Sequence, residues 1–514
     1  MPRITIDDRM VEAAEGLTLL RAAESAGIPI PHFCYHPAFA PEGSCRMCLI
    51  EIEGLPKLEL ACSTLVKEGL KVRTKSAKVV EARKGVLEFL LADHPLDCPI
   101  CDQAGECKLQ DYFDEYGLFR SQFKETKEKR EKKFKLGRNL ILDRERCILC
   151  TRCVRFLDEI TKTQEAGILN RGIRSEVGVF ESEVIDNNYS GNLAQICPVG
   201  AITDLDFRFK TRVWFLESRE SVCPLCSRGC NIVIDSHPGH PRTPCPRRVY
   251  RIRARENPDV NSYWICDYGR YGYAYLDEGR QAKLVWKKGG RETRLSWDKT
   301  SQILTEKIRS LGFRGKTSRI GIVLHTNLTN EELFLADRVF RKGLNVEKFF
   351  LADPPPGKGD EFLLTSDRTA NRRGLQEAGP PVQAPDLKSL SELDLLLIFG
   401  HYLAAGTSPG ELKNALEKVE TKALFSSHRS DLDGLVDFVI PVPVIAEKSG
   451  TLTNIDGRVQ SFTSGLEFKG EGLPEWRALL DLAKELRIET EYSWPLASPE
   501  AVFRALQKEI PFYR

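Results

Sequence analysis

The cysteines constrain this chain more than any other feature. All sixteen lie between Cys34 and Cys266, and none occurs in the remainder of the 514-residue sequence. So many cysteines suit disulfides in a small secreted domain, but this long chain starts with MPRITIDDRM, which shows no secretory signal, and metal binding is favoured. The sequence therefore predicts metal chemistry concentrated in its first half.

The charge and the apolar runs of the chain exclude two classes of protein. Its 75 basic and 73 acidic residues leave a formal charge of +2. That argues against nucleic acid as the partner, because such proteins carry a strong positive field. The longest apolar runs, at 393–400 and 436–446, are too short to span a membrane. We therefore expect a cytoplasmic chain without direct membrane insertion.

The first set of candidate ligands follows a predicted strand and helix. RITID at 3–7 alternates as a strand does, and a helix is expected from near Thr18 to Gly27. Gly43 and Ser44 suit a loop whose backbone N–H groups approach sulfur atoms. This pattern favours a small ferredoxin sheet around a [2Fe–2S] cluster, although ten residues separate its first two cysteines where the plant-type spacing has four. The first set is Cys34, Cys45, Cys48 and Cys62.

The second set contains a histidine. Residues 78–92 carry apolar side chains at helical spacing, which places His94 at the end of a helix. An imidazole can replace a thiolate on iron, so one histidine and three cysteines can hold a [4Fe–4S] cluster with one negative charge fewer and a higher potential. The alternative is that His94 only caps the helix, beside a zinc site or a three-cysteine cluster. The second set is His94, Cys98, Cys101 and Cys107.

The third and fourth sets have ferredoxin-like spacings. The third set is a CxxCxxC run with a later Cys-Pro, and it favours one [4Fe–4S] cluster because no second CxxCxxC run shares its ligands. The fourth set, CxxCxxxC with a distant cysteine, suits another [4Fe–4S] cluster, with zinc as the competing metal. Cys245 is left over and is expected to be a free thiol. The third set is Cys147, Cys150, Cys153 and Cys197, and the fourth is Cys223, Cys226, Cys230 and Cys266.

In this order the four sets resemble the large iron–sulfur subunit of bacterial NADH-quinone oxidoreductase, which is part of the peripheral arm of respiratory complex I. The second set is the most specific part of the resemblance, and the motifs together cover 34–272. More faintly, WDK at 297–299 and AEKSGTLTNIDGRVQSF at 446–462 resemble pieces of the molybdopterin oxidoreductase fold. The resemblance implies one [2Fe–2S] cluster and three [4Fe–4S] clusters.

The C-terminal region alternates strands and helices. SRIGIVL (318–324) precedes the helical NEELFLADRVF, and DLLLIFG precedes GELKNALEKVE and then KALFSS, which is a parallel α/β pattern. The region is shorter than a complete molybdopterin domain and has no cysteine to ligate molybdenum. We therefore expect a truncated domain that holds no molybdopterin.

The expected fold class is modular α/β. We expect a β-grasp-like [2Fe–2S] ferredoxin domain at 1–77, a helical His-Cys₃ [4Fe–4S] segment at 78–123, a charged linker at 124–138, a ferredoxin-like [4Fe–4S] domain at 139–214, a [4Fe–4S] subdomain of molybdopterin-oxidoreductase type at 215–272 and the truncated α/β domain at 273–514. Six arginines within 242–256 are interpreted as a surface patch or, alternatively, as charges that offset a cluster or dock an acidic partner.

The resemblance implies an electron-transfer subunit without a substrate-converting site of its own. No complete glycine-rich phosphate motif is visible. FMN and NADH are therefore expected on partners, namely an NADH-binding FMN/iron–sulfur subunit, beside a small [2Fe–2S] subunit and a quinone-side iron–sulfur subunit. The resemblance also allows a peripheral position on the cytoplasmic face of the inner membrane, through these partners.

Three alternatives stay open. One is the equivalent subunit of a soluble NAD-linked or electron-bifurcating hydrogenase, or of a formate dehydrogenase complex. Another is a molybdenum or tungsten formate dehydrogenase in its own right, which the short, cysteine-free C-terminal half argues against. A zinc-rich scaffold is the third, and the histidine in the second set argues against it.

Overall fold

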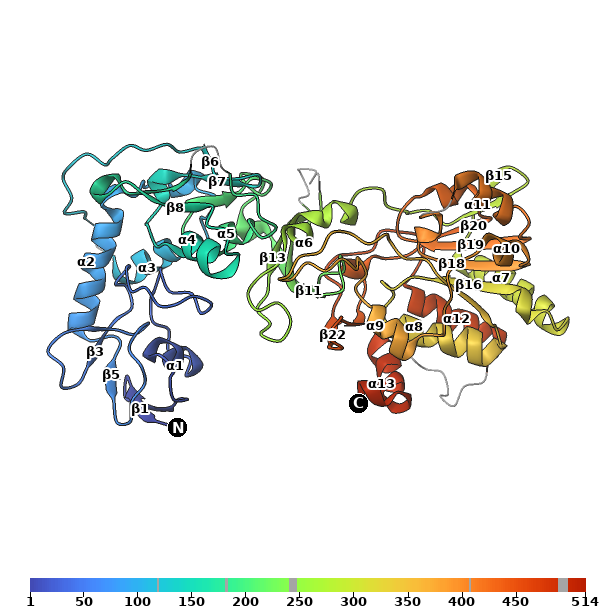
Figure 1. Ribbon diagram of the computed structural model, residues 1–514, viewed down its shortest axis with the longest axis horizontal. Coiled ribbons are helices and arrows are strands. Elements are labelled where there is room, and N and C mark those ends of the chain that lie inside the picture. The colour runs from blue at the N-terminus through green and yellow to red at the C-terminus, as the bar shows by residue number, and fades with distance from the viewer. Residues whose placement is uncertain (118–119, 181–183, 240–246, 406–407, 489–497) are drawn as a thin grey trace. The chain divides into compact units, whose positions relative to one another are not determined.

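The computed structural model describes residues 1–117, 120–180, 184–239, 247–405, 408–488 and 498–514. The chain divides into two compact units, unit 1 (Met1–Leu216) and unit 2 (Glu217–Arg514), which are the blue-to-green and the green-to-red parts of the ribbon (Figure 1). Each unit has its own sheets and its own hydrophobic core. The finer division into six segments stays a prediction.

Unit 1 begins with a five-stranded mixed sheet in the order β2-β1-β5-β3-β4. β1 pairs antiparallel with β2 and parallel with β5, and β5 pairs antiparallel with β3. The hydroxyl of Thr18 accepts from the backbone N–H of Arg21 and so starts α1, whose buried leucines join the core of the sheet. The bounds are β1 (Arg3–Ile6), β2 (Arg9–Glu12), α1 (Leu19–Ser25), β3 (Leu49–Ile52), β4 (Glu59–Leu60) and β5 (Lys71–Arg73).

The rest of unit 1 consists of short elements around one long helix. Ser76 caps the start of α2, and His94 stands at its C-terminal end, where the apolar spacing placed it. A three-stranded sheet, β10-β7-β6, and the hairpin β8–β9 follow. The bounds are α2 (Ala77–Asp93), α3 (Lys108–Tyr116), β6 (Phe134–Lys135), β7 (Leu140–Leu142), α4 (Arg152–Arg155), β8 (Ala166–Leu169), β9 (Glu176–Val179), α5 (Asn192–Ile196) and β10 (Ile202–Asp204).

Unit 2 has a small antiparallel sheet and a large one. The small sheet is β11-β12-β13, and α6 follows it. The large sheet has seven strands in the order β15-β14-β20-β19-β18-β16-β17, and its last five are parallel, as the strand–helix alternation predicted. The first bounds are β11 (Glu217–Val222), β12 (Asn231–Ser236), β13 (Val249–Ala254), α6 (Asp267–Tyr271), β14 (Val285–Lys288), β15 (Arg291–Arg294), β16 (Ile320–Leu324), β17 (Lys348–Leu351), β18 (Leu395–Phe399), β19 (Thr421–Ser426) and β20 (Phe438–Pro441).

Helices cover both faces of the large sheet. Alternate residues of its buried strands belong to two cores, one shared with α7, α8, α12 and α13, the other with α10 and α11 (Figure 1). The chain reverses its direction of winding between β16 and β18, which is where α/β sheets bind ligands. The bounds are α7 (Trp297–Phe313), α8 (Asn330–Ala336), α9 (Arg372–Ala378), α10 (Leu387–Ser391), α11 (Pro409–Leu416), β21 (Gly450–Thr453), β22 (Val459–Phe462), α12 (Glu475–Leu486) and α13 (Pro499–Glu509).

A helix that crosses a bilayer must be both long and apolar. Within the described residues, no helix meets both conditions.

Candidate metal centres

The four thiols of the first set are neighbours. Cys45 donates a hydrogen bond to Cys34 and Cys48 donates one to Cys62, while Cys34 and Cys62 interact through their charges. The bond from Cys45 lowers the pKa of Cys34 to about 5, and the bonds to Cys34 and Cys62 raise the pKa values of the two donors. Two thiols of the set therefore keep their protons until metal displaces them.

The loop around Cys45 has the backbone that the sequence predicted. Gly43 has a φ of 71° and Arg46 a φ of 56°, both in the left-handed region. The backbone N–H of Phe33 donates to Sγ of Cys45 at 3.4 Å. The Ser44 side chain hydrogen-bonds to Cys34 and contributes to its lowered pKa. Hydrogen-bond donors to sulfur are therefore present in this loop, and at Cys34 they favour the ionised form.

In the second set the three cysteines act on one another, whereas His94 is linked to them through Arg146. Cys98, Cys101 and Cys107 interact through their charges, and burial raises the pKa of Cys107 to about 11. The positive charge of Arg146 acts on both His94 and Cys101. Burial lowers the pKa of His94 to about 4, so its imidazole is neutral near pH 7, as a metal ligand must be.

The imidazole of His94 does not serve as a helix cap. Lys127 takes that role, because its Nζ donates to the carbonyl oxygens of Ala92 at 3.1 Å and His94 at 2.9 Å. Nδ1 of His94 is buried and has no hydrogen-bond partner among the described residues. A buried nitrogen without a partner is costly unless a bound ligand takes it. This favours the metal-ligand interpretation of His94 over the capping one.

The third set lines one small cavity of unit 1. All four of its thiols border that cavity, together with apolar side chains that include Leu142 and Val199. Burial raises the pKa of Cys147 to about 11 and of Cys150 to about 12. A thiolate would be unfavourable in such a pocket unless positive charge accompanied it. The cavity therefore fits a group that supplies cationic iron to four thiolates.

Arg146 connects the second and third sets. It is buried and donates from Nε and one terminal nitrogen to the carboxylate of Asp97, at 3.1 and 2.8 Å. Asp97 directly precedes Cys98, and Arg146 directly precedes Cys147. The backbone of Gly200 passes so near the Sγ of Cys101 that an added Cβ would overlap the sulfur.

Two further arginines connect the first and third sets. Arg152 donates to the carbonyl oxygens of Tyr35 and Ile196. Arg155 donates to the carbonyl oxygens of Cys34 and Ala40, and its bond to Ala40 measures 2.9 Å. Within unit 1, the loops that carry three sets are therefore tied to one another by guanidinium groups.

The fourth set lies in unit 2, at the end of its small sheet. The backbone N–H of Cys223 donates to the carbonyl oxygen of Cys230 at 2.8 Å, and all four cysteines are buried and interact through their charges. Cys266 stands at the start of α6, where its Sγ accepts from the N–H of Gly269 at 3.3 Å. A Cβ on Gly269 would lie 3.2 Å from Sγ of Cys223, so a small residue suits this position.

A cavity borders the fourth set at the carboxyl ends of β16, β18 and β19. Its lining includes Leu225, Tyr275, His325, His401, His428 and Lys448. Lys448 is engaged with the carboxylates of Glu332 at 2.8 Å and Glu475 at 3.0 Å, so its charge is not available to an anionic ligand.

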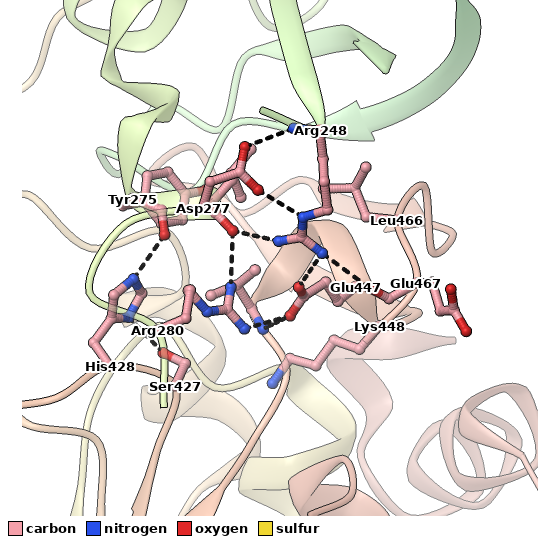
Figure 2. A network of polar contacts seen from close by, with 12 residues as sticks. Arg248, Tyr275, Asp277, Arg280, Ser427, His428, Glu447, Lys448, Leu466 and Glu467 are labelled. Atoms are coloured by element: carbon pink, nitrogen blue, oxygen red, sulfur yellow. Dashed lines mark hydrogen bonds and ion pairs between the residues drawn. The ribbon is translucent and has the colours of Figure 1, made fainter. Parts of the chain in front are cut away.

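Four of the six arginines between Cys230 and Cys266, and Arg280 after them, pair with carboxylates. Arg248 bonds Asp277 and Glu447, and Arg280 bonds the same glutamate, while His428 donates to the carbonyl of Tyr275 (Figure 2). On β13, Arg251 and Arg253 both form ion pairs with Asp235. Arg255, directly after this strand, forms an ion pair with Glu220. These arginines keep partly exposed side chains, and the interpretation of the run as a surface patch stays a prediction. Arg242 and Cys245 lie outside the described residues.

The predicted linker also has contacts that its composition did not indicate. Besides Lys127, which caps α2, Lys132 pairs with Asp97 at 3.2 Å and with Glu145 at 2.6 Å. The run is therefore part of the surroundings of the second set. The arginines at 146, 152 and 155 were missed as well, although RERCILCTRCVR places all three beside cysteines.

The spacing of the donors bears on the kind of metal group. In the described parts of the chain, no three His, Cys, Asp or Glu side chains gather closely enough for a single metal ion. Cluster ligands surround a core of several iron and sulfide atoms, so they stand farther apart than the ligands of one ion. Which metal group each set holds stays a prediction at this point.

Three family models match the chain within unit 1. They are described as a 2Fe-2S iron-sulfur cluster binding domain (residues 2–77), the NADH-ubiquinone oxidoreductase-G iron-sulfur binding region (83–122) and the NADH-quinone oxidoreductase subunit 3 ferredoxin-like domain (137–203). Their order confirms the expected modular fold class, and each spans one of the first three sets.

Similar proteins match over more of the chain. NADH-quinone oxidoreductase subunit 3 of Thermus thermophilus is 36% identical over 66% of this chain and 46% of its own length. The NADH-ubiquinone oxidoreductase 75 kDa subunit of Reclinomonas americana is 35% identical over 78% of this chain and 56% of its own. A solved structure of NAD+-reducing [NiFe]-hydrogenase in the H2-reduced state is 32% identical with a TM-score of 0.38, over 41% of this chain and 91% of that one. This chain spans about half the length of the curated relatives it matches.

Proposed function

The chain belongs to the family of the large iron–sulfur subunit of NADH-quinone oxidoreductase, and on that basis we propose that it carries electrons from an NADH-oxidising flavoprotein subunit toward quinone. The first set would hold one [2Fe–2S] cluster, and the other three sets one [4Fe–4S] cluster each. The observation that carries the proposal is the architecture of unit 1. There Arg146, Arg152 and Arg155 tie the loops of three sets to one another.

The donor groups of the chain fit these clusters. The second set offers a neutral imidazole whose buried nitrogen lacks a partner among the described residues. In the third set, burial raises the pKa values of all four thiols, so thiolate there depends on accompanying positive charge. Bound clusters would supply reversible one-electron redox chemistry.

The residues of the chain would hold the ligands and tune their surroundings. Backbone N–H groups donate to sulfur at Cys45, Cys147 and Cys266, and such bonds would stabilise the thiolates once a cluster is bound, although the pKa of each thiol is raised without it. Apolar residues around the third set exclude water from the thiols. Potentials would then be set by ligand identity, hydrogen bonds and burial.

The remaining chemistry would belong to partners. We propose that FMN and NADH bind a flavoprotein subunit, that a small [2Fe–2S] subunit accompanies it, and that a quinone-side iron–sulfur subunit accepts the electrons. Through these the chain would sit on the cytoplasmic face of the inner membrane. Unit 2 would hold no molybdopterin, since the ammonium group of Lys448, which lines its cavity, is already paired.

Iron analysis of the anaerobically purified full chain tests the cluster assignment. One [2Fe–2S] and three [4Fe–4S] clusters predict about 14 iron atoms per chain. About ten irons with one zinc would remove the fourth cluster from the proposal. Cys245→Ser is the matched control, because this cysteine lies outside the four sets and its replacement should leave the iron content unchanged.

The route of the electrons needs a separate measurement. The proteins that co-purify with the chain should include an FMN-containing, NADH-oxidising subunit and a quinone-side subunit. Recovery of hydrogenase subunits instead would overturn the quinone assignment and leave the cluster assignment standing.

A further inference from the structure

Arg152 occupies a buried position between two predicted cluster sites. It stands between Cys150 and Cys153 in the sequence, yet only 7% of its surface is exposed. One terminal nitrogen donates to the carbonyl oxygen of Ile196 at 3.1 Å, and the other donates to that of Tyr35. Ile196 directly precedes Cys197 of the third set, and Tyr35 directly follows Cys34 of the first.

The charge of Arg152 is not balanced by a carboxylate. Among the described residues, no Asp or Glu lies within ion-pair distance of it, and its Nε is buried without a hydrogen-bond partner. The groups that favour its charged form are the sulfur atoms of Cys150, Cys197 and Cys34, which would be anionic as cluster ligands. They belong to both sets. Burial is the largest cause that lowers its pKa, as expected for a guanidinium held away from water.

The neighbouring arginines differ in this respect. Arg146 pairs with Asp97 at 2.8 Å and Asp143 at 3.4 Å, and Arg155 pairs with Glu42 at 3.3 Å. A carboxylate cancels most of the field that such a cation exerts on its surroundings. Among the described residues, Arg152 alone of the three lacks a carboxylate partner, and its guanidinium bonds the carbonyl oxygens of residues next to Cys197 and Cys34.

We propose that Arg152 raises the redox potentials of the first-set [2Fe–2S] cluster and the third-set [4Fe–4S] cluster together. The inference rests on the proposed function, since it needs both clusters. Reduction adds one negative charge to a cluster, and a buried cation stabilises that charge because the surrounding medium screens it weakly. One guanidinium that contacts the ligand loops of both sets affects both potentials in the same direction.

Potentials measured by redox-titrated EPR on the full, cluster-loaded chain test this role. Arg152→Gln removes the charge and keeps a hydrogen-bonding side chain, so both potentials should fall. Arg152→Lys keeps the positive charge but loses the planar guanidinium group, so both redox potentials should stay near their native values. Arg144→Gln is the matched control, because Arg144 is already paired with Glu131 and Glu176 and its loss should move neither potential.

The outcomes separate this inference from the proposed function. A native chain without the two EPR signals would contradict the proposed function itself. If the native chain shows both signals and Arg152→Gln moves one potential or neither, the shared-charge role is wrong. If Arg152→Gln fails to assemble a cluster, the potentials measured for Arg152→Lys decide between the charge role and a purely structural role. Native-like potentials there support the charge role, whereas a fall in either potential or a lost cluster shows that Arg152 only holds the loops together.

Discussion

Unit 1 and unit 2 differ in how they hold their candidate metal ligands. Unit 1 carries three sets on loops and short elements, and its strands are two to four residues long. Unit 2 carries one set at the edge of a small sheet, next to a seven-stranded sheet with a core on each face. In unit 1 arginine–carbonyl bonds connect the loops that carry the sets, whereas in unit 2 the set lies in the same compact unit as a large sheet with a core on each face.

Each unit also has its own buried charges. In unit 1 the charges of the buried Arg146 and Arg152 act on cysteine thiols. In unit 2 the buried cation Lys448 is fixed between Glu332 and Glu475, and burial raises the pKa of Glu475 to about 8. Buried positive charge therefore lies near predicted cluster ligands in unit 1 and within a lysine–carboxylate network in unit 2.

Cys150→Ala should have the largest effect. Removing one ligand of the third set should abolish electron transfer from NADH to the final acceptor. The reason is that arginines connect the loops of this set to those of the first and second sets in unit 1. Reduction of the flavin on the partner subunit should continue. Turnover of the assembled complex and stopped-flow flavin reduction measure the two steps. Full turnover in a complex that lacks the third-set EPR signal would place the set off the path.

Lys448→Met should destabilise unit 2 by roughly 3–5 kcal/mol, because it leaves two buried carboxyl groups without their cation. Hydrogen exchange of the β16 and α8 amides in the full chain measures the loss. Lys413→Met is the control, since the Lys413–Glu417 pair is exposed and measures 3.9 Å. Equal protection in both variants would show that the buried network does not stabilise unit 2. The EPR signals of unit 1 should be unchanged.

His94→Cys should produce a smaller, local change. A fourth thiolate makes the second-set cluster more negative, so its potential should fall while the other sets keep theirs. Redox-titrated EPR of the assembled protein reports each potential separately. Unmoved potentials throughout would show that His94 is not an iron ligand and that its unpartnered Nδ1 has another explanation.

The features that the sequence predicted are those that depend on residues close together along the chain. The helix ending at His94 and the parallel strands β16, β18 and β19 followed from apolar spacing, because periodicity reports which face of an element is buried. Grouping of the cysteines followed from their spacing. In the first set the four thiols interact with one another, and their assignment as cluster ligands stays a prediction.

The connections between the sets could not be predicted in this way. Arg152 meets Tyr35 across 117 positions of sequence, and Lys127 reaches the carbonyl of His94 across 33. Nothing in the local pattern distinguishes such residues from solvated surface charge, since their partners are backbone carbonyls that every residue has. The carboxylate partners of the arginines between Cys230 and Cys266 could not be predicted for the same reason, because Asp235 and Glu447 lie on other strands and turns.

Cys226→Ala should have the smallest effect on turnover, and it tests the comparison most directly. The fourth set belongs to unit 2, whose cavity has no charge available to an anionic ligand at Lys448. If the domain holds no substrate chemistry, its cluster has no donor or acceptor of its own. Electrons would then need only the sets of unit 1, and turnover per intact complex should fall little. The iron content should drop by about four atoms, and the small sheet should lose local stability.

Loss of iron without loss of turnover is therefore the signature that separates the two units. Turnover is measured per assembled complex, with flavin content as the reference, so that poorer assembly is not mistaken for slower transfer. Cys150→Ala in the same preparation provides the comparison, since both variants remove one buried thiolate from a four-ligand set. If Cys226→Ala stops turnover as completely as Cys150→Ala, the fourth set lies on the electron path. The buried network of Lys448, Glu332 and Glu475 would then be part of the environment of a working redox centre.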